Sequence, residues 1–179
     1  MMGYGVVSRM FHWVTVLMVF TMIPVGIIMT QELPRSIQNP LFILHKGLGV
    51  IVLVVVLARL AWRIAVPPPP PPPGLSEFQR RAAAIVHVAL YAALLVMAIS
   101  GYVRVIAGGF PIELLNALDV PPLLPKNEAL AGAAKSVHAA TAFVLIALVA
   151  VHVGAALHHA LGLRDGVMAR MWPPIPQTK

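Results

Sequence analysis

The sequence predicts an all-α protein, a bundle of four transmembrane helices that forms a single domain over residues 1–179. Of these residues, 59% are hydrophobic and only 11% are charged, well below the roughly 25% of charged residues in a typical soluble domain. Four apolar segments are long enough to cross about 30 Å of hydrocarbon as helices. The expected spans are residues 11–29, 41–64, 82–103 and 136–158.

The distribution of charge predicts that both termini are cytoplasmic. The N-terminus, the second loop with its flanks and the C-terminus together carry eight basic and two acidic side chains, whereas the other two loops carry five and four. Basic residues concentrate on the cytoplasmic side of membrane proteins, so the first group is expected there. The net charge of +7 forms no basic stripe outside the spans, and we do not expect nucleic acid as a partner.

The first span and the loops also carry predictions. The first span is about twenty residues long and has no A-x-A-like cleavage site followed by a soluble domain, so we interpret it as retained and not as a signal peptide. Seven prolines at 67–73 favour a polyproline II segment of about 22 Å, a stiff cytoplasmic linker or, alternatively, a ligand for a proline-recognition domain. PIELLNAL, in the third loop, resembles a short amphipathic helix that lies at the interface as a lid, although an irregular loop is the alternative.

The last span carries His138 and His152 on nearly one face. Fourteen residues turn an α-helix by about 1400°, about 40° short of four full turns, and advance it by about 21 Å. Each imidazole therefore lies toward one membrane face, where an unpartnered polar ring is costly. Two buried ligands at this spacing suggest two stacked metal centres.

Histidines of the other spans supply partners at matching depths. His45, in the second span, lies near the expected depth of His138, so these two form an outer pair. At the inner depth, His152 can pair with either His12 or His87, and spacing alone does not choose between them.

The spacing of fourteen residues recurs in the other three spans. Arg59 returns to the face of the second-span histidine at the inner leaflet, where its guanidinium can bind an acidic cofactor group or simply snorkel. Gly26 and Gly101 follow the histidines of the first and third spans at the same interval. A missing side chain there leaves room for a bulky group or for the close approach of another helix.

Facing imidazoles in a helix bundle favour b-type haem. Two histidines satisfy the axial positions of the iron, and the flat apolar macrocycle fits between helices. Zinc is less favoured because a structural site needs four protein ligands. A proton relay through separate histidines is the main alternative without haem. The chain has no cysteine, which excludes c-type haem attachment and thiolate-bound iron–sulfur clusters.

These features together resemble the bacterial cytochrome b561 family, which is related to di-haem cytochrome b subunits of hydrogenases and formate dehydrogenases. The resemblance covers essentially the whole chain and rests on SRMFHW, PRS, LHKG, RLAWR, KSVH, VHVGAALHH and the closing RD and RMWP. In that family the first and fourth helices hold the inner haem, and the second and fourth hold the outer one. The resemblance therefore implies His12 with His152 and His45 with His138 as iron ligands, and leaves His87 as a hydrogen-bonded neighbour.

The resemblance implies an oxidoreductase of the bacterial cytoplasmic membrane. Two six-coordinate haems would pass single electrons between reactants at the two faces by outer-sphere transfer, with Leu145, Leu148 and Val149 filling the helix surface between them. The implied acceptor is ubiquinone and the implied donor is superoxide. Superoxide is an anion, so we expect Lys46, beside the outer histidine of the second span, and Lys135, at the start of the fourth, to guide it.

Reduction of ubiquinone also requires two protons, which polar groups near the cytoplasmic interface can supply. The candidates are His158, His159, Arg80 and Arg81. Equally, these four can be ordinary topology charges and snorkelling side chains.

Two other functions remain open at this point. The chain can be a cytochrome b anchor subunit that passes electrons between a partner dehydrogenase and quinone. It can also be a haem-free membrane scaffold or a proton-handling protein, with its histidines in hydrogen-bonded networks.

Overall fold

The computed structural model describes residues 3–172 and is helical throughout its regular structure. The elements in this range are α1 (Val6–Ile28), α2 (Arg35–Ala65), α3 (Glu77–Ala107), α4 (Glu113–Ala117), α5 (Glu128–Leu157), a π-helix (His158–Leu163) and a 3-10 helix (Met168–Arg170). Four of these helices, α1, α2, α3 and α5 with its π-helical end, are long and apolar enough to cross a membrane. The all-helical class is therefore confirmed, together with four helices that are long and apolar enough to span a membrane.

The helices extend beyond the predicted spans because polar residues cap them outside the apolar windows. Ser76 and Gln79 form a reciprocal capping box at the start of α3. The side chain of Asn127 accepts a hydrogen bond from the amide of Leu130 and starts α5 eight residues before the expected span. Such caps satisfy amides of the first turn, which have no partner inside the helix.

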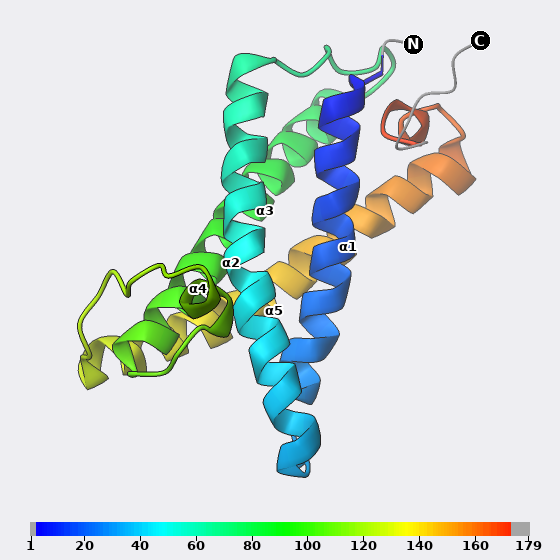
Figure 1. The fold of residues 1–179 in the computed structure, drawn as a ribbon. Helices are drawn as coiled ribbons and strands as arrows, with labels where there is room; N and C mark the ends of the chain where they lie inside the picture. The colour runs from blue at the N-terminus through cyan, green and yellow to red at the C-terminus, as the bar shows by residue number, and fades with distance from the viewer. Residues whose placement is uncertain (1–2, 173–179) are drawn as a thin grey trace.

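The four long helices do not pack equally against one another. The closest packing is between α3 and α5, followed by α1 with α2 and α2 with α3. Figure 1 shows α1 and α2 side by side, with α3 and α5 inclined to them. In the part of the chain that the structure describes, α5 makes few or no close backbone contacts with α1 or α2. The predicted cofactor ligands therefore lie on two helix pairs, α1 with α5 and α2 with α5, whose backbones make few or no close contacts.

One end of the bundle brings together the start of the chain, the proline linker and the last described segment. Arg170 donates hydrogen bonds to the carbonyls of Pro69 (3.2 Å) and Pro70 (2.7 Å), and its guanidinium lies 5.6 Å from the ring centre of Tyr4. The amide of Tyr4 donates to the carbonyl of Arg170 at 3.1 Å. We call this the inner end and the opposite one the outer end. The cytoplasmic location of the inner end stays a prediction from charge.

The expected short helix of the third loop is present at the outer end as α4. It begins at Glu113, one residue after Ile112, so Pro111 precedes the helix and does not lie in its first turn. Lys46 on α2 donates hydrogen bonds to the carbonyl of Pro111 (2.6 Å) and to Glu113 Oε1 (2.8 Å). This ion pair ties α4 to the second span.

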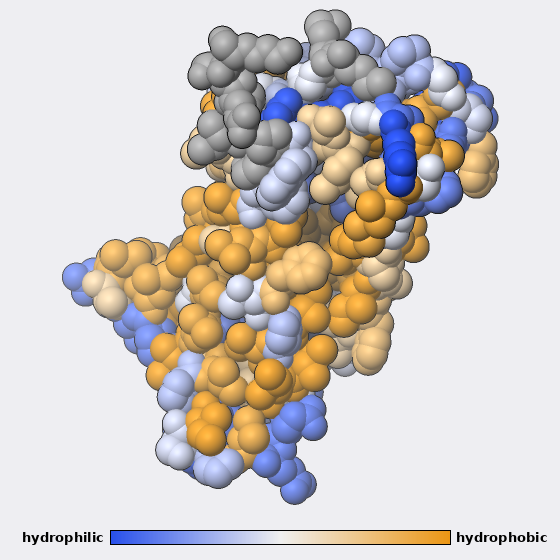
Figure 2. All heavy atoms as spheres, turned by 90° about the vertical axis from the view of Figure 1, so that its right-hand side faces the viewer, coloured by the Kyte–Doolittle hydropathy of each residue, from blue (hydrophilic) through white to orange (hydrophobic). Residues whose placement is uncertain are grey.

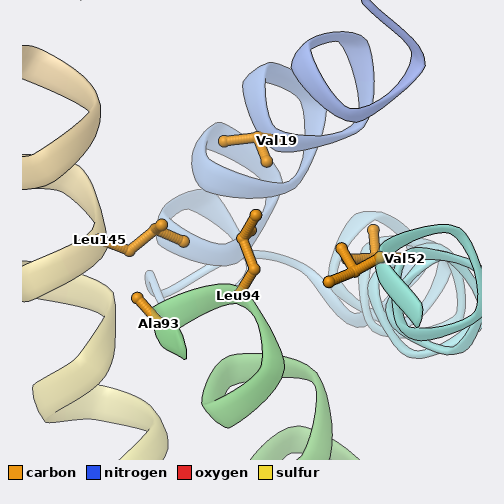
Figure 3. Packing of buried hydrophobic residues seen from close by; sticks show 6 residues of the cluster. Val19, Val52, Ala93, Leu94 and Leu145 are labelled. Carbon is orange, nitrogen blue, oxygen red and sulfur yellow. The ribbon is translucent and has the colours of Figure 1, made fainter. Parts of the chain in front are cut away.

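A compact apolar cluster fills the middle of the bundle (Figure 3). Its buried members are Val19, Val52, Val56, Ala93, Leu94 and Leu145. Leu148 and Val149 pack against this cluster and are partly buried, as expected for the surface between the two histidine depths. All four long helices contribute to it, so the middle of the bundle is closed by side-chain packing.

Most other apolar side chains point outward. Figure 2 shows a hydrophobic surface across the middle of the molecule and hydrophilic residues gathered toward both ends. Phe143 on α5 is 78% exposed and Leu17 on α1 is 70% exposed. A band of this kind suits lipid tails, because large exposed apolar surfaces are rare on soluble monomers.

We expect Leu145→Ala to lower the free energy of unfolding by about 2 kcal/mol or more, because truncation leaves a cavity in the cluster. The neighbouring Val144→Ala removes a side chain that is 54% exposed and should cost about 0.5 kcal/mol or less. Denaturant titration of the purified protein in detergent measures both. Equal costs for the two variants would contradict the assigned core.

Candidate haem sites

Residues at intervals of seven divide the bundle into three layers. Seven residues advance a helix by about 10 Å and return nearly to the same face. The outer layer consists of Gly26, His45, Gly101 and His138. The middle layer consists of Val19, Val52, Leu94 and Leu145. The inner layer consists of His12, Arg59, His87 and His152. Each long helix therefore contributes one residue to every layer.

The outer layer holds two facing imidazoles. The ring centres of His45 on α2 and His138 on α5 are 6.3 Å apart, and the ring planes are 82° apart. A Cβ on Gly26 would lie 3.0 Å from His45 Cε1, and one on Gly101 would lie 3.1 Å from His138 Cε1. Both glycines thus give an imidazole room to lie against the neighbouring helix.

Hydrogen bonding prepares His138 to bind a metal. Its Nδ1 lies 3.0 Å from the carbonyl oxygen of Met97 and 3.3 Å from Ser100 Oγ. Because a carbonyl oxygen only accepts, Nδ1 carries the proton and Nε2 keeps a free lone pair. His45 Nδ1 is buried and has no hydrogen-bond partner in residues 3–172. The described chain thus leaves one nitrogen of this buried ring unsatisfied, as is expected where a further group binds.

The inner layer brings three histidines together. The ring centres of His12 on α1 and His152 on α5 are 6.2 Å apart, with ring planes 71° apart. His87 on α3 lies closer to His152, with ring centres 5.4 Å apart. Arg59 Nη2 lies 3.2 Å from His12 Nδ1. The structure therefore places both predicted partners of His152 beside it.

Three pairs of histidine rings lie close together in the two layers. In two of them the ring centres have the separation expected when both imidazoles bind one haem iron. Two metal–imidazole bonds of about 2 Å, together with the two ring radii, separate ring centres by about 6.3 Å. His12–His152 and His45–His138 have this separation, and His87–His152 is shorter. Both fitting pairs join α5 to a helix with which it makes few or no close backbone contacts.

The donor set suits a metal that needs only two protein ligands. Within residues 3–172, no group of three or more His, Cys, Asp or Glu side chains is arranged to hold a metal ion. A structural zinc site needs four such ligands, whereas haem supplies four nitrogens of its own.

Two arginines line the inner end beside these rings. Arg59 and Arg63, one turn apart on α2, lie over the ring of Tyr91 at 5.2 and 5.8 Å. They share a pocket with Tyr4 and Trp62. Of these residues, the sequence pattern predicts only Arg59. Arg63 lies four residues after Arg59 and Tyr91 lies four residues after His87, so each shares a helix face with a predicted residue.

The two lysines nominated at the outer end differ in environment. Lys46 is only 15% exposed, and its ammonium is held by Glu113 and the carbonyl of Pro111. Burial opposes ionisation of Glu113, but the hydrogen bond and charge of Lys46 hold the pKa of Glu113 below its ordinary value. The side chain of Lys135 is exposed and makes no hydrogen bond or ion pair within the described chain. No local pattern signals the contact between Lys46 and Glu113, because the two residues are 67 positions apart.

Three of the four nominated proton donors of the inner end form two separate contacts, and the ring centre of the fourth, His158, lies 6.1 Å from that of His159. Arg80 and Arg81 both bond to Glu77, at 2.6 and 2.7 Å. His159 Nδ1 lies 2.6 Å from Asp165 Oδ2, in a segment where α5 continues as a π-helix from His158 onward. Burial raises the pKa of Asp165, but the hydrogen bonds from His159 and from backbone amides, together with the charge of His159, outweigh it, and the net pKa is lowered.

Comparisons with known proteins agree with this geometry. The family model of prokaryotic cytochrome b561 matches residues 3–174. Cytochrome b561 homolog 2 of Escherichia coli (strain K12) is 34% identical over 169 residues, which cover 94% of this chain and 90% of that protein. Cytochrome b561 homolog 1 of the same organism is 28% identical over 164 residues, covering 90% and 92%. The chain therefore belongs to the prokaryotic cytochrome b561 family of membrane cytochromes, which bind b-type haem and transfer electrons.

Proposed function

We propose that this protein binds two b-type haems and moves single electrons across the bacterial cytoplasmic membrane, from superoxide at the outer end to ubiquinone at the inner end. His45 and His138 bind the outer haem iron, and His12 and His152 bind the inner one. The observation that carries this proposal is the pair of facing imidazoles in each layer, 6.3 and 6.2 Å apart.

The residues around each pair have definite tasks in this scheme. Haem, when bound, supplies reversible one-electron redox chemistry, and two axial histidines leave no open position for oxygen. The carbonyl of Met97 fixes the ring and tautomer of His138. Arg59, whose Nη2 lies 3.2 Å from His12 Nδ1, would be the residue that binds an acidic group of the cofactor. The middle layer keeps water out between the two centres.

Charge at the two ends supports the direction of transfer. Lys135 is the exposed cation one turn before His138, where an anionic donor would approach. At the inner end, Asp165 holds the ring of His159 by its Nδ1, which leaves Nε2 to pass a proton to a reduced quinone. His158, Arg80 and Arg81 serve as the neighbouring polar groups of that interface.

Changing any one of His12, His45, His138 or His152 to alanine should remove about half of the haem, because each iron loses one of its two protein ligands. His87→Ala should retain both haems and serves as the matched control from the same inner layer. Reduced-minus-oxidised optical spectra with haem quantified per chain measure this. Loss of haem in the His87 variant, with retention in the His12 variant, would reverse the inner assignment. An unmodified protein without haem would refute the proposal.

In proteoliposomes that contain ubiquinone, superoxide should reduce the haems and then the quinone. The rate constant for superoxide should fall as ionic strength rises, because screening weakens attraction between the anion and the outer cations. Stopped-flow spectroscopy at several salt concentrations measures the rate, and superoxide dismutase abolishes the reaction as a control. If superoxide leaves the haems oxidised while a copurifying dehydrogenase reduces them, the protein is an anchor subunit and superoxide is not its donor.

A further inference from the structure

Arg104 lies on the face of α3 that supports the outer histidine pair. Met97, Ser100 and Gly101 all contact His138, through a carbonyl, a hydroxyl and a bare Cα. Arg104 follows these residues by seven, four and three positions, so it belongs to the same helix face. Its side chain therefore starts one turn beyond His138 toward the outer end.

Arg104 is partly buried. The side chain of Arg104 lies on the face of α3 that contacts His138. Within residues 3–172 it makes no hydrogen bond or ion pair. An arginine side chain stays protonated and carries five N–H donors, and a charge withdrawn from water is stable only with a partner. The structure thus leaves a partly buried, unpaired cation one turn from the outer histidine pair.

The other cations near the outer pair do not fill this role. Lys46 adjoins His45 in sequence, but Glu113 neutralises it and α4 covers it. Lys135 is exposed to solvent, where its field is weakened by water and salt. Among the cations that sequence spacing puts near this layer, Arg104 alone is both partly buried and unpaired in the described chain.

We propose that Arg104 binds a small oxyanion at the outer histidine pair. A planar guanidinium matches a carboxylate or a dioxygen anion with two parallel hydrogen bonds. Two sources have this chemistry: a propionate of the outer haem and the anionic electron donor. The inference rests on the proposed function and names the residue that completes its outer site.

The test compares Arg104→Gln and Arg104→Lys in the full-length, haem-loaded protein. Lys126→Gln is the matched control, since it removes one positive charge from an exposed lysine on the same side, 3.6 Å from Glu128. Three quantities are measured for each protein: haem per chain, the midpoint potential of each haem, and the rate of reduction by superoxide against ionic strength.

If Arg104 binds a propionate, Arg104→Gln lowers the midpoint potential or the occupancy of the outer haem and leaves the inner haem unchanged. The potential falls because loss of a nearby positive charge favours the oxidised iron, and Arg104→Lys restores part of the effect because it keeps the charge. If Arg104 binds the donor, both haems keep their occupancy, and the rate at low salt falls by about tenfold or more, further than any shift in potential accounts for, with a weaker salt dependence.

The proposal is overturned if Arg104→Gln matches Lys126→Gln in all three measurements. The unmodified protein then still shows two haems, so the proposed function stands while this inference fails. An unmodified protein without haem would refute the proposed function, and with it this inference, because Arg104 would then complete no outer site.

Discussion

The repeat of seven residues, shared by all four long helices, is the constraint on which the rest of the structure depends. Nearly two helical turns separate successive layers, so His138, Leu145 and His152 on α5 face the same interior. The other three helices, running alternately up and down, place a complementary residue at each level. A buried imidazole thereby meets a second imidazole, and apolar side chains meet between the two levels. A change of register in one helix would disrupt all three layers together.

Glycine and arginine complete the layers in different ways. Gly26 and Gly101 stand where any side chain would crowd an outer imidazole. At the inner level, Arg59 and Arg63 lie over Tyr91 beside the histidines. At the outer end fewer charges contact the histidine rings. Lys46 is instead paired with Glu113, and this ion pair joins α4 to α2. Arginine, which keeps its charge in an apolar setting, suits both levels better than lysine.

Much of this architecture follows from local pattern, and the exceptions are long-range. Hydropathy predicts the four spans, and helical periodicity predicts the pairing of His45 with His138 by depth. The helices are longer than the predicted spans because capping at Ser76 and Asn127 acts outside the apolar windows. Periodicity leaves two equivalent partners for His152, and the family resemblance and the ring spacing both favour His12. The sequence predicts Lys46 as an accessible cation, but its ion pair in the structure depends on how the third loop folds back.

We propose that each haem iron is held by two imidazoles whose planes are steeply inclined, as the rings are in this structure, by 82° in the outer layer and 71° in the inner. Low-temperature electron paramagnetic resonance of the oxidised protein measures this inclination. Two low-spin ferric signals are expected, both strongly anisotropic because the axial rings are nearly perpendicular, and no high-spin signal. A single low-spin species, or a high-spin signal from an iron with an open position, would contradict it.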